Sequence, residues 1–329
     1  MHIDFVLPWV DGGDSEWIKQ KELFSGGKTS EDDNREIRFR DWETLRYWFR
    51  GVERFAPWVN KIHFITWGHL PEWLNTEHPK LHIVNHKDYI PAEYLPTFSS
   101  HVIELNMHRI SGLNEHFVYF NDDIFILNTL KESDFFVDGL PCDLCVANAI
   151  TPRLGEFSPI LLQTTSYINK HFNKREDMRK NFHKWFTLKY GTLLVRTLCL
   201  FPWTFHTGFY NHHLAVPYKK ITLETVWDEE PEILNQTCLH RFRNNQDVNQ
   251  YIFRYWQLAS GEFQPHKNIG KYMNMGEDNS RIFKTIRTQS AKMLCINDKD
   301  IIADFETEKS KLISAFDTVF TNKSLFEKS

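Results

Sequence analysis

Residues 3–14 read IDFVLPWVDGGD, an apolar run that stops at a polar, glycine-containing turn. The run predicts a short buried strand within residues 2–10, whose apolar side chains are Ile3, Phe5, Val6 and Leu7. Asp11–Asp14 then predicts a sharp turn directly after the strand. A buried strand that opens into acidic and glycine residues is a typical first unit of a ligand-binding α/β sheet.

Strands and helices alternate along the first 150 residues. Further strands are predicted at 61–67, 81–84, 116–120 and 143–147. One helix is predicted after a cap at Asp41, with the apolar face Leu45, Trp48, Phe49, Val52 and Phe55. Another is predicted after Ser99 or Ser100, with Ile103, Met107 and Ile110 on one face and Gly112 as its end. This alternation predicts an α/β fold, Rossmann-like, with a mainly parallel sheet and helices on both faces.

Composition places the chain among soluble globular proteins. It has 329 residues, of which 41% are hydrophobic and 25% charged, and its formal net charge is −4. These values exclude a disordered, collagenous or coiled-coil chain, and they exclude the large basic surface of a duplex-binding protein, so no nucleic-acid partner is expected. The aromatic content of 15% suits either a site for sugars and nucleobases or a core rich in Phe and Trp.

The sequence also bears on cellular context. The N-terminal stretch has no basic segment before its short apolar run, and no run of about 18 apolar residues occurs. Five cysteines without a framework spacing are typical of a reducing compartment, so we expect a cytoplasmic protein. Cys142 and Cys145 could form half of a metal site or a redox pair, or they could be two small residues of a buried strand.

Beyond residue 150 the pattern becomes helical. We expect one catalytic domain over residues 1–300, with 151–205 as a helical insertion and 301–329 as a C-terminal helical segment. Residues 170–189 hold seven basic residues with aromatics interleaved. Such a segment could lie on an anionic membrane, as a peripheral contact at the inner face of the plasma membrane, or it could be a solvated helix packed by one face. A later helix is predicted at 245–259.

Three polar clusters could carry chemistry. Asn121–Asp123 follows the 116–120 strand, where carboxylates could hold Mg²⁺ or Mn²⁺ or could cap the next element. Residues 210–220 include His212, His213, Lys219 and Lys220. A histidine of near-neutral pKa is a good general base and lysine can neutralise phosphate, although a zinc site or a pair of packed turn histidines would use the same residue types.

The third cluster, residues 240–247, contains Arg241 and Arg243. Guanidinium groups match phosphate oxygens, and the start of the predicted 245–259 helix would add a positive end. Asp247 near that start could simply favour the helix dipole.

These pieces occur in a familiar order, and the chain resembles the Stealth family of sugar-phosphate transferases. That family includes bacterial capsular polysaccharide phosphotransferases and the catalytic part of the lysosomal GlcNAc-1-phosphotransferase. The resemblance is carried by four blocks: residues 3–14; a series from Arg38 to Asp123 that includes 56–59, 71–74 and 95–101; residues 212–220 with 241–249; and residues 294–298. It implies a glycosyltransferase-A-like sheet and transfer of a sugar-1-phosphate from a nucleotide diphosphate sugar to a glycan hydroxyl.

The resemblance and the residue chemistry together assign roles. His213 or His212 would remove the acceptor proton, and Arg241, Arg243 and Asp123 would complete the catalytic set. Asp122, Asp123 and Asp298 would bind a divalent metal, Mg²⁺ or Mn²⁺. The expected substrate-binding residues are Asp11, Gly12, Gly13, Arg40, His101, Asn121, Lys219, Lys220 and Asp247.

Two other functions are compatible with the same residues. A metal-dependent glycosyltransferase would release a nucleoside diphosphate rather than a monophosphate, and a non-catalytic carbohydrate-binding protein would show no turnover. The acceptor is expected to be an oligosaccharide or polysaccharide, either free or linked to a lipid pyrophosphate.

Overall fold

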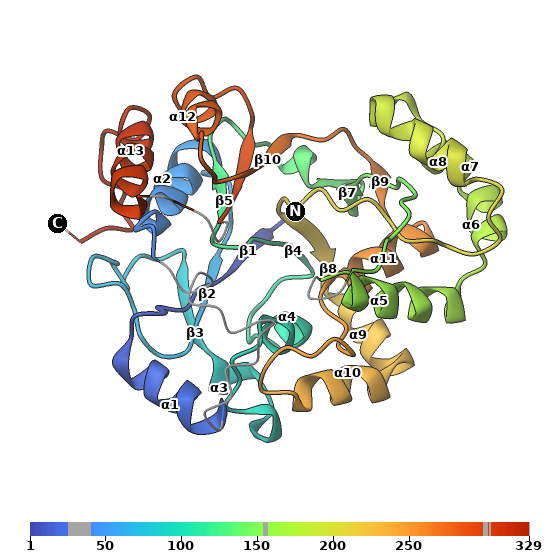
Figure 1. Cartoon of the computed structure of the whole chain (residues 1–329), viewed down its shortest axis with the longest axis horizontal. Coiled ribbons are helices and arrows are strands. Elements are labelled where there is room, and N and C mark those ends of the chain that lie inside the picture. Colours follow the sequence, from blue (N-terminus) through green and yellow to red (C-terminus); the bar gives the residue numbers. More distant parts are fainter. Residues whose placement is uncertain (26–40, 154–156, 299–301, 303, 329) are drawn as a thin grey trace.

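The computed structural model describes residues 1–25, 41–153, 157–298, 302 and 304–328 (Figure 1). Its centre is a five-stranded sheet in the order β3-β2-β1-β4-β8. The strands are β1 (Ile3–Pro8), β2 (Ile62–Thr66), β3 (Leu81–Asn85), β4 (His116–Tyr119) and β8 (Val216–Lys219). The first four are parallel and β8 pairs antiparallel with β4. The predicted mixed α/β class with a mainly parallel sheet is therefore confirmed, and β1 lies at its middle.

A buried carboxylate ties the amino end of this sheet together. Asp4 of β1 accepts hydrogen bonds from Asn60 Nδ2 at 2.7 Å and from the backbone N–H of Asn114 at 2.9 Å, and it lies 3.1 Å from His63 Nε2. Burial alone would raise the pKa of Asp4, but these partners outweigh it and the pKa is lowered. The charge on Asp4 therefore joins β1, β2 and the segment before β4.

Helices cover both faces of the sheet, as the alternating pattern predicted. Ile3, Phe5 and Leu7 of β1 face one core and Val6 faces the other. The first core is closed by α2 (Leu45–Phe55), α12 (Ser280–Arg287) and α13 (Phe305–Asp317). The second is closed by α3 (His86–Tyr89), α4 (Ser100–Leu105), α9 (Lys220–Glu229), α10 (Pro231–Leu239) and α11 (Tyr251–Ser260). Helix α1 (Ser15–Ser25) follows the first turn.

Two small sheets extend the central one. The first has the order β10-β11-β5, with β5 (Ile124–Ile126), β10 (Gly270–Asn274) and β11 (Met293–Asn297). The second has the order β6-β7-β9, with β6 (Phe136–Val137), β7 (Leu140–Asp143) and β9 (Gln264–Pro265). Because β5 follows β4 by only a few residues, the first small sheet stands next to the end of β4.

Residues 158–200 are largely helical and form a lobe at one side (Figure 1). Its α-helices are α5 (Ser158–His171), α6 (Lys174–Lys180), α7 (Phe182–Trp185) and α8 (Leu194–Leu200). Short 3-10 turns occur at Ala92–Tyr94, Met107–Arg109, Glu132–Asp134 and Leu188–Leu193. Within the described ranges, no helix combines the length and apolar character needed to cross a bilayer.

Several element boundaries differ from the predicted ones. Asp41 does not cap α2; its Oδ1 accepts a hydrogen bond from the backbone N–H of Glu43, and the helix begins at Leu45. The helix after Ser99 ends at Leu105, because Asn106 Nδ2 donates to the Val102 carbonyl and a 3-10 turn follows.

Two further predicted elements are displaced. The strand predicted at 143–147 lies at Leu140–Asp143, because Leu144 N–H bonds the Asp143 side chain and leaves the ladder. Helix α11 begins at Tyr251 rather than at 245, because Asn249 Oδ1 accepts the Tyr251 N–H. Cys142 and Cys145, which flank Asp143 and Leu144 at the end of β7, are free and buried.

The C-terminal segment is part of the first core. Phe316 of α13 is fully buried, stacks on Tyr47 at 4.8 Å between ring centroids and lies 4.7 Å from Phe125. Farther along, Arg50 Nε donates to Glu327 Oε1 at 2.7 Å. Residues 305–328 therefore pack against α2 and the small sheet.

We expect Phe316→Ala to lower the free energy of unfolding by about 3–5 kcal/mol, because it leaves a cavity under α2. Urea denaturation followed by tryptophan fluorescence measures the change. Leu325→Ala is the matched control, since this side chain is 71% exposed and its loss should leave the midpoint almost unchanged. A separate early transition in Phe316→Ala, with the main one unshifted, would show that the segment unfolds on its own.

Candidate active site

The topology gathers three predicted clusters at one edge of the central sheet. Asp11–Asp14 follows the carboxyl end of β1 and Asn121–Asp123 follows that of β4. Because β8 is antiparallel, with Val216 opposite Tyr119, its amino end meets the same edge. His212 and His213, which precede β8, are therefore brought beside Asn121–Asp123, ninety residues away in the chain.

A pocket of about 130 Å³ opens at this edge. It is lined by Tyr119, Asn121, Asp123, Ile124, His213, Leu214, Val216, Gln250, Tyr251, Tyr272, Cys295 and Asn297. Three of these residues, Asn121, Asp123 and His213, were predicted as site residues. Tyr119, Gln250, Tyr251 and Tyr272 were missed, because an aromatic or amide residue in an apolar segment carries no distinctive signal.

The acidic wall of the pocket, which consists of Asp123 and the neighbouring Asp122, makes few hydrogen bonds. Asp123 Oδ2 accepts a hydrogen bond from Cys295 Sγ at 3.3 Å, while its Oδ1 is buried and makes no hydrogen bond within the described residues. Burial and the neighbouring Asp122 carboxylate raise the pKa of Asp123 to about 7. Desolvation raises the pKa of Asp122 to about 6. A positive charge placed here would stabilise both carboxylates.

The predicted metal ligands Asp122, Asp123 and Asp298 are not assembled as one set. Nowhere in the described part of the chain do three or more His, Cys, Asp or Glu side chains converge as metal ligands. Asp298 follows β11, and its Oδ2 accepts a hydrogen bond from Trp42 Nε1 at 3.0 Å. Asp298 directly follows the pocket residue Asn297 in sequence, but its carboxylate is hydrogen-bonded to Trp42.

His213 stands at the pocket with an unusual backbone. Its φ is +51°, a conformation that residues other than glycine adopt rarely and that is often found at functional sites. Its ring lies 4.6 Å from the ring of Tyr272. Desolvation, with smaller contributions from His212 and Arg254, lowers the pKa of His213 to about 4. The imidazole is therefore neutral at pH 7 and can accept a proton.

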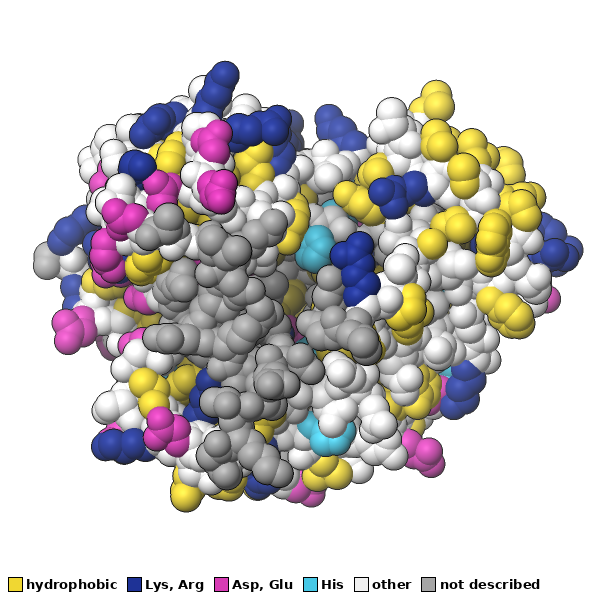
Figure 2. All heavy atoms as spheres, in the orientation of Figure 1, with side chains coloured by type: hydrophobic (Ala, Val, Ile, Leu, Met, Phe, Trp, Pro, Cys, Tyr) yellow, Lys and Arg dark blue, Asp and Glu magenta, His cyan; other side chains and the backbone are white. Residues whose placement is uncertain are grey.

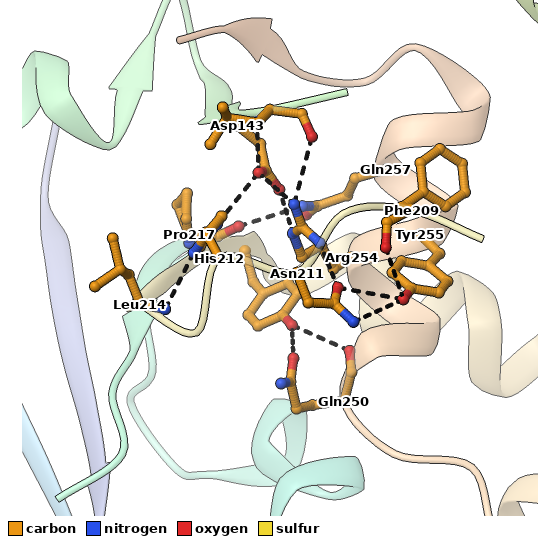
Figure 3. Close-up of polar contacts among 12 residues, drawn as sticks. Asp143, Phe209, Asn211, His212, Leu214, Pro217, Gln250, Arg254, Tyr255 and Gln257 are labelled. Atoms are coloured by element: carbon orange, nitrogen blue, oxygen red, sulfur yellow. Dashed lines mark hydrogen bonds and ion pairs between the residues drawn. The ribbon is translucent and has the colours of Figure 1, made fainter. Parts of the chain in front are cut away.

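His212 is held on both of its ring nitrogens (Figure 3). Its Nδ1 accepts a hydrogen bond from the Leu214 N–H at 3.1 Å, and its Nε2 lies 3.4 Å from Asp143 Oδ1. This pattern assigns the proton to Nε2 of a neutral ring, and burial lowers the pKa of His212 further. Both ring nitrogens of His212 are therefore occupied by contacts within the protein.

Asp143 in turn forms a buried ion pair with Arg254 of α11 (Figure 3). Arg254 Nε donates to Asp143 Oδ2 at 2.7 Å and Nη2 donates to Oδ1 at 2.8 Å, while Nη1 donates to Asn211 Oδ1 at 2.8 Å. Burial alone would raise the pKa of Asp143, but Arg254 and His212 outweigh it and the pKa is lowered. The pair fixes the segment that carries His213, and sequence reasoning missed it.

A second histidine–carboxylate cluster lies at the start of α4. Asp247 is buried between two imidazoles, with Oδ2 3.0 Å from His101 Nδ1 and Oδ1 2.7 Å from His240 Nδ1. His101 Nε2 is buried and has no hydrogen-bond partner among the described residues. Asp247 therefore orients side chains rather than favouring a helix dipole.

Helix α4 connects this cluster to the pocket. One turn after His101, the Glu104 carboxylate accepts a hydrogen bond from the Tyr119 hydroxyl at 3.0 Å, and its other oxygen lies 3.5 Å from the Gln250 backbone N–H. Arg243 joins the same helix, since its Nη2 donates to Ser100 Oγ at 2.8 Å. Arg241 stacks over the ring of Phe24 at 4.9 Å. Neither arginine lines the pocket, and the helix start beside Arg243 is that of α4 at Ser100 rather than the one predicted at residue 245.

The first turn is ordered by its own side chains. Asp11 Oδ1 accepts the Gly13 N–H at 2.8 Å, and the Asp11 N–H donates to His69 Nε2 at 2.7 Å. Gly12 lies between these anchored residues. His69, which follows β2, was not predicted; its position after a parallel strand was the available signal.

Two predicted substrate-binding residues, Lys219 and Lys220, are not brought to the pocket. Lys219 pairs with His116 at the opposite end of β4, and its Nζ lies 3.3 Å from Glu262 Oε2. Lys220 begins α9 and its Nζ lies 3.9 Å from Glu224 Oε1. The four-residue length of β8 separates both lysines from the histidines. Arg40 lies outside the described residues.

The chain is similar to known proteins of one family. Two family models match the chain: Stealth protein CR1, conserved region 1, over residues 1–29, and Stealth protein CR2, conserved region 2, over residues 38–142. The capsular polysaccharide phosphotransferase WcwK of Streptococcus pneumoniae is 44% identical over 328 residues, covering 99% of this chain and 98% of the relative.

Other relatives and one solved structure extend the comparison. The exopolysaccharide phosphotransferase cps2G of Lactiplantibacillus plantarum is 39% identical, covering 99% of this chain and 96% of the relative. The receptor polysaccharide phosphotransferase WefC of Streptococcus gordonii is 38% identical, covering 99% and 98%. The galactosyltransferase LgtC aligns over 96% of both chains with 9% identity and a TM-score of 0.40. At this score the likeness says nothing about substrate or mechanism.

We expect Arg254→Met to lower the free energy of unfolding by about 3–5 kcal/mol, because it leaves the Asp143 charge buried and unpaired. Denaturation by urea measures the loss. The double substitution Asp143→Leu with Arg254→Met should be more stable than Arg254→Met alone. Lys19→Met, which breaks an exposed pair with Glu16, is the control and should change little. Equal stability of Arg254→Met and the wild type would contradict the assignment.

Proposed function

The chain belongs to the Stealth family, and we propose that it transfers a sugar-1-phosphate from a nucleotide diphosphate sugar to a hydroxyl of a glycan acceptor. The observation that carries the proposal is the pocket itself, which is lined by the neutral imidazole of His213 and by the Asp123 carboxylate. One oxygen of that carboxylate has no hydrogen bond among the described residues. The named activities of the 44%, 39% and 38% identical relatives support the same class of transfer in capsular or exopolysaccharide synthesis.

The proposed reaction is a single displacement at phosphorus. The acceptor hydroxyl oxygen attacks the phosphorus that carries the sugar, and the bond from that phosphorus to the bridging oxygen of the diphosphate breaks. The sugar keeps its C1–O bond, the product is a phosphodiester, and the leaving group is a nucleoside monophosphate. Such transfer depends mainly on positioning and charge neutralisation, with a base to take the proton.

His213 is the proposed base. The pocket places it beside Asn121 and Asp123, and its lowered pKa keeps the ring unprotonated at neutral pH. The adjacent His212 acts as a positioning residue, because the Leu214 N–H and Asp143 occupy its two nitrogens. The backbone turn at His213 follows that anchored neighbour, and the imidazole lines the pocket while it stays exposed to solvent.

A divalent cation, Mg²⁺ or Mn²⁺, fits the acidic wall. Magnesium at phosphate substrates commonly takes one or two protein carboxylates and completes its shell with phosphate oxygens and water. Asp123 has a buried oxygen without a hydrogen bond among the described residues, and Asn121 and Asn297 line the same pocket. These residues, with Asp122 beside them, would hold the cation, which would neutralise the diphosphate.

Arg241, Arg243 and the turn Asp11–Gly13 are proposed to bind the substrates. Arg241 and Arg243 offer guanidinium forks for phosphate oxygens, and the Ser100 contact holds Arg243 near His101 on α4. The ordered turn Asp11–Gly13 lies beyond β1, where nucleotides bind in parallel sheets. The acceptor is proposed to be an oligosaccharide or polysaccharide, with a lipid-pyrophosphate-linked chain as one form.

The leaving nucleotide tests the reaction type. Incubation with a panel of nucleotide diphosphate sugars, Mg²⁺ and a glycan acceptor should release a nucleoside monophosphate, detected by ion-exchange chromatography. Release of a nucleoside diphosphate would identify a glycosyltransferase instead. Retained glycan binding without any turnover across the panel would identify a carbohydrate-binding protein.

His213→Ala should lower the transfer rate by about 10²–10⁴-fold, because the proton of the acceptor hydroxyl loses its base. Calorimetric titration should show that nucleotide-sugar binding persists. His183→Ala removes an exposed histidine of the helical lobe and serves as the control. If His213→Ala turned over at the wild-type rate, the base would have to be sought elsewhere.

A further inference from the structure

The helical lobe carries large apolar side chains on its outside. In Figure 2 hydrophobic side chains gather over the region where α7 and α8 lie in Figure 1. We define the lobe patch as the exposed residues Phe182, Leu188, Val195, Leu198, Phe201, Trp203 and Phe205. Their exposed fractions range from 53% to 91%. These large apolar side chains are not buried in the protein's own core, so their exposure to water needs another explanation.

The patch is continuous and firmly supported. Phe182 lies 4.8 Å from Phe186, which in turn lies 6.0 Å from Phe201, so α7 and the end of α8 share one aromatic cluster. Beneath it, the buried Lys174 donates from Nζ to the carbonyls of Leu200 at 2.6 Å and Trp203 at 2.9 Å. The turn that displays the aromatic residues is therefore fixed to the lobe core.

The charge around the patch is mainly positive, although the exposed Glu176 of α6 pairs with Lys180. Between Asp177 and Glu224 the sequence contains no acidic residue. Exposed basic side chains lie on the helices that carry or adjoin the patch: Arg175, Arg179, Lys180, Lys189 and Arg196. Aromatic and aliphatic side chains surrounded by lysine and arginine match the interface of a bilayer that contains anionic lipid.

We propose that the lobe patch docks the enzyme on an anionic lipid bilayer, with its aromatic residues at the headgroup boundary and the surrounding arginines and lysines on lipid phosphates. The surface carries no catalytic group. If the proposed reaction holds, docking would bring the pocket to acceptors attached to lipid, but binding to the bilayer does not depend on that reaction.

Vesicle sedimentation tests this proposal. Wild-type protein should co-sediment with vesicles of phosphatidylcholine and phosphatidylglycerol at low salt, weakly with phosphatidylcholine alone, and less as salt rises. The double substitution Leu198→Asp with Phe201→Asp should lower the partition coefficient by at least about tenfold. Each substitution removes an apolar side chain that the bilayer would bury and adds a negative charge that anionic lipid repels.

The control is Leu239→Asp, because Leu239 is 52% exposed on α10 against 53% for Leu198. The control should sediment like the wild type, and both variants should keep the wild-type denaturation midpoint and turnover on a soluble acceptor. Absence of wild-type sedimentation with anionic vesicles, or equal loss in the control, would overturn the proposal. A lower molar mass of the patch variant in light scattering, with unchanged sedimentation, would assign the patch to a second copy of the chain instead.

Discussion

The arrangement of the pocket depends on the buried ion pair between Asp143 and Arg254. It joins β7 to α11 and, through Asn211 and His212, holds the segment that enters β8. Two charges removed from water are stable only when their hydrogen-bonding capacity is met, and here the carboxylate has both the guanidinium and an imidazole. The position of His213 is therefore set by a contact that lies behind it.

Buried carboxylates also hold the side chains around Tyr119, which lines the pocket. Asp247 holds His101 and His240, and Glu104 holds Tyr119 through its hydroxyl. Both carboxylates are buried, so the polar groups around the cavity are positioned from within the protein rather than by solvent. Asp123 Oδ1 and His101 Nε2 depart from this pattern, since both are buried and have no hydrogen bond among the described residues. Polar capacity is thus left open at the cavity and at the neighbouring cluster.

The sequence predicted β1, β2, β3 and β4 of the central sheet and one side of the pocket, but it did not predict β8. Strands with continuous apolar runs, such as β1 and β2, have only one way to be buried, and Asn121–Asp123 follows from the end of β4. The ends of elements that are set by side-chain hydrogen bonds could not be predicted from the sequence. Residues 245–250 resemble a helix start, yet the Asn249 side chain accepts the Tyr251 N–H and the Asp247 carboxylate contacts His240. Lys219 and Lys220 neighbour His213 in sequence, but an antiparallel strand carries them away from it.

The pairing of β5 with β11 joins residues 124–126 to residues 293–295. During synthesis β5 emerges early and lacks its partner until nearly the whole chain has left the ribosome. Its unpaired edge, made of Ile124, Phe125 and Ile126, is then open to association with other nascent chains. The last strand to arrive both completes the pocket wall through Cys295 and covers this edge. One strand pairing therefore both closes the pocket wall and protects an apolar strand edge.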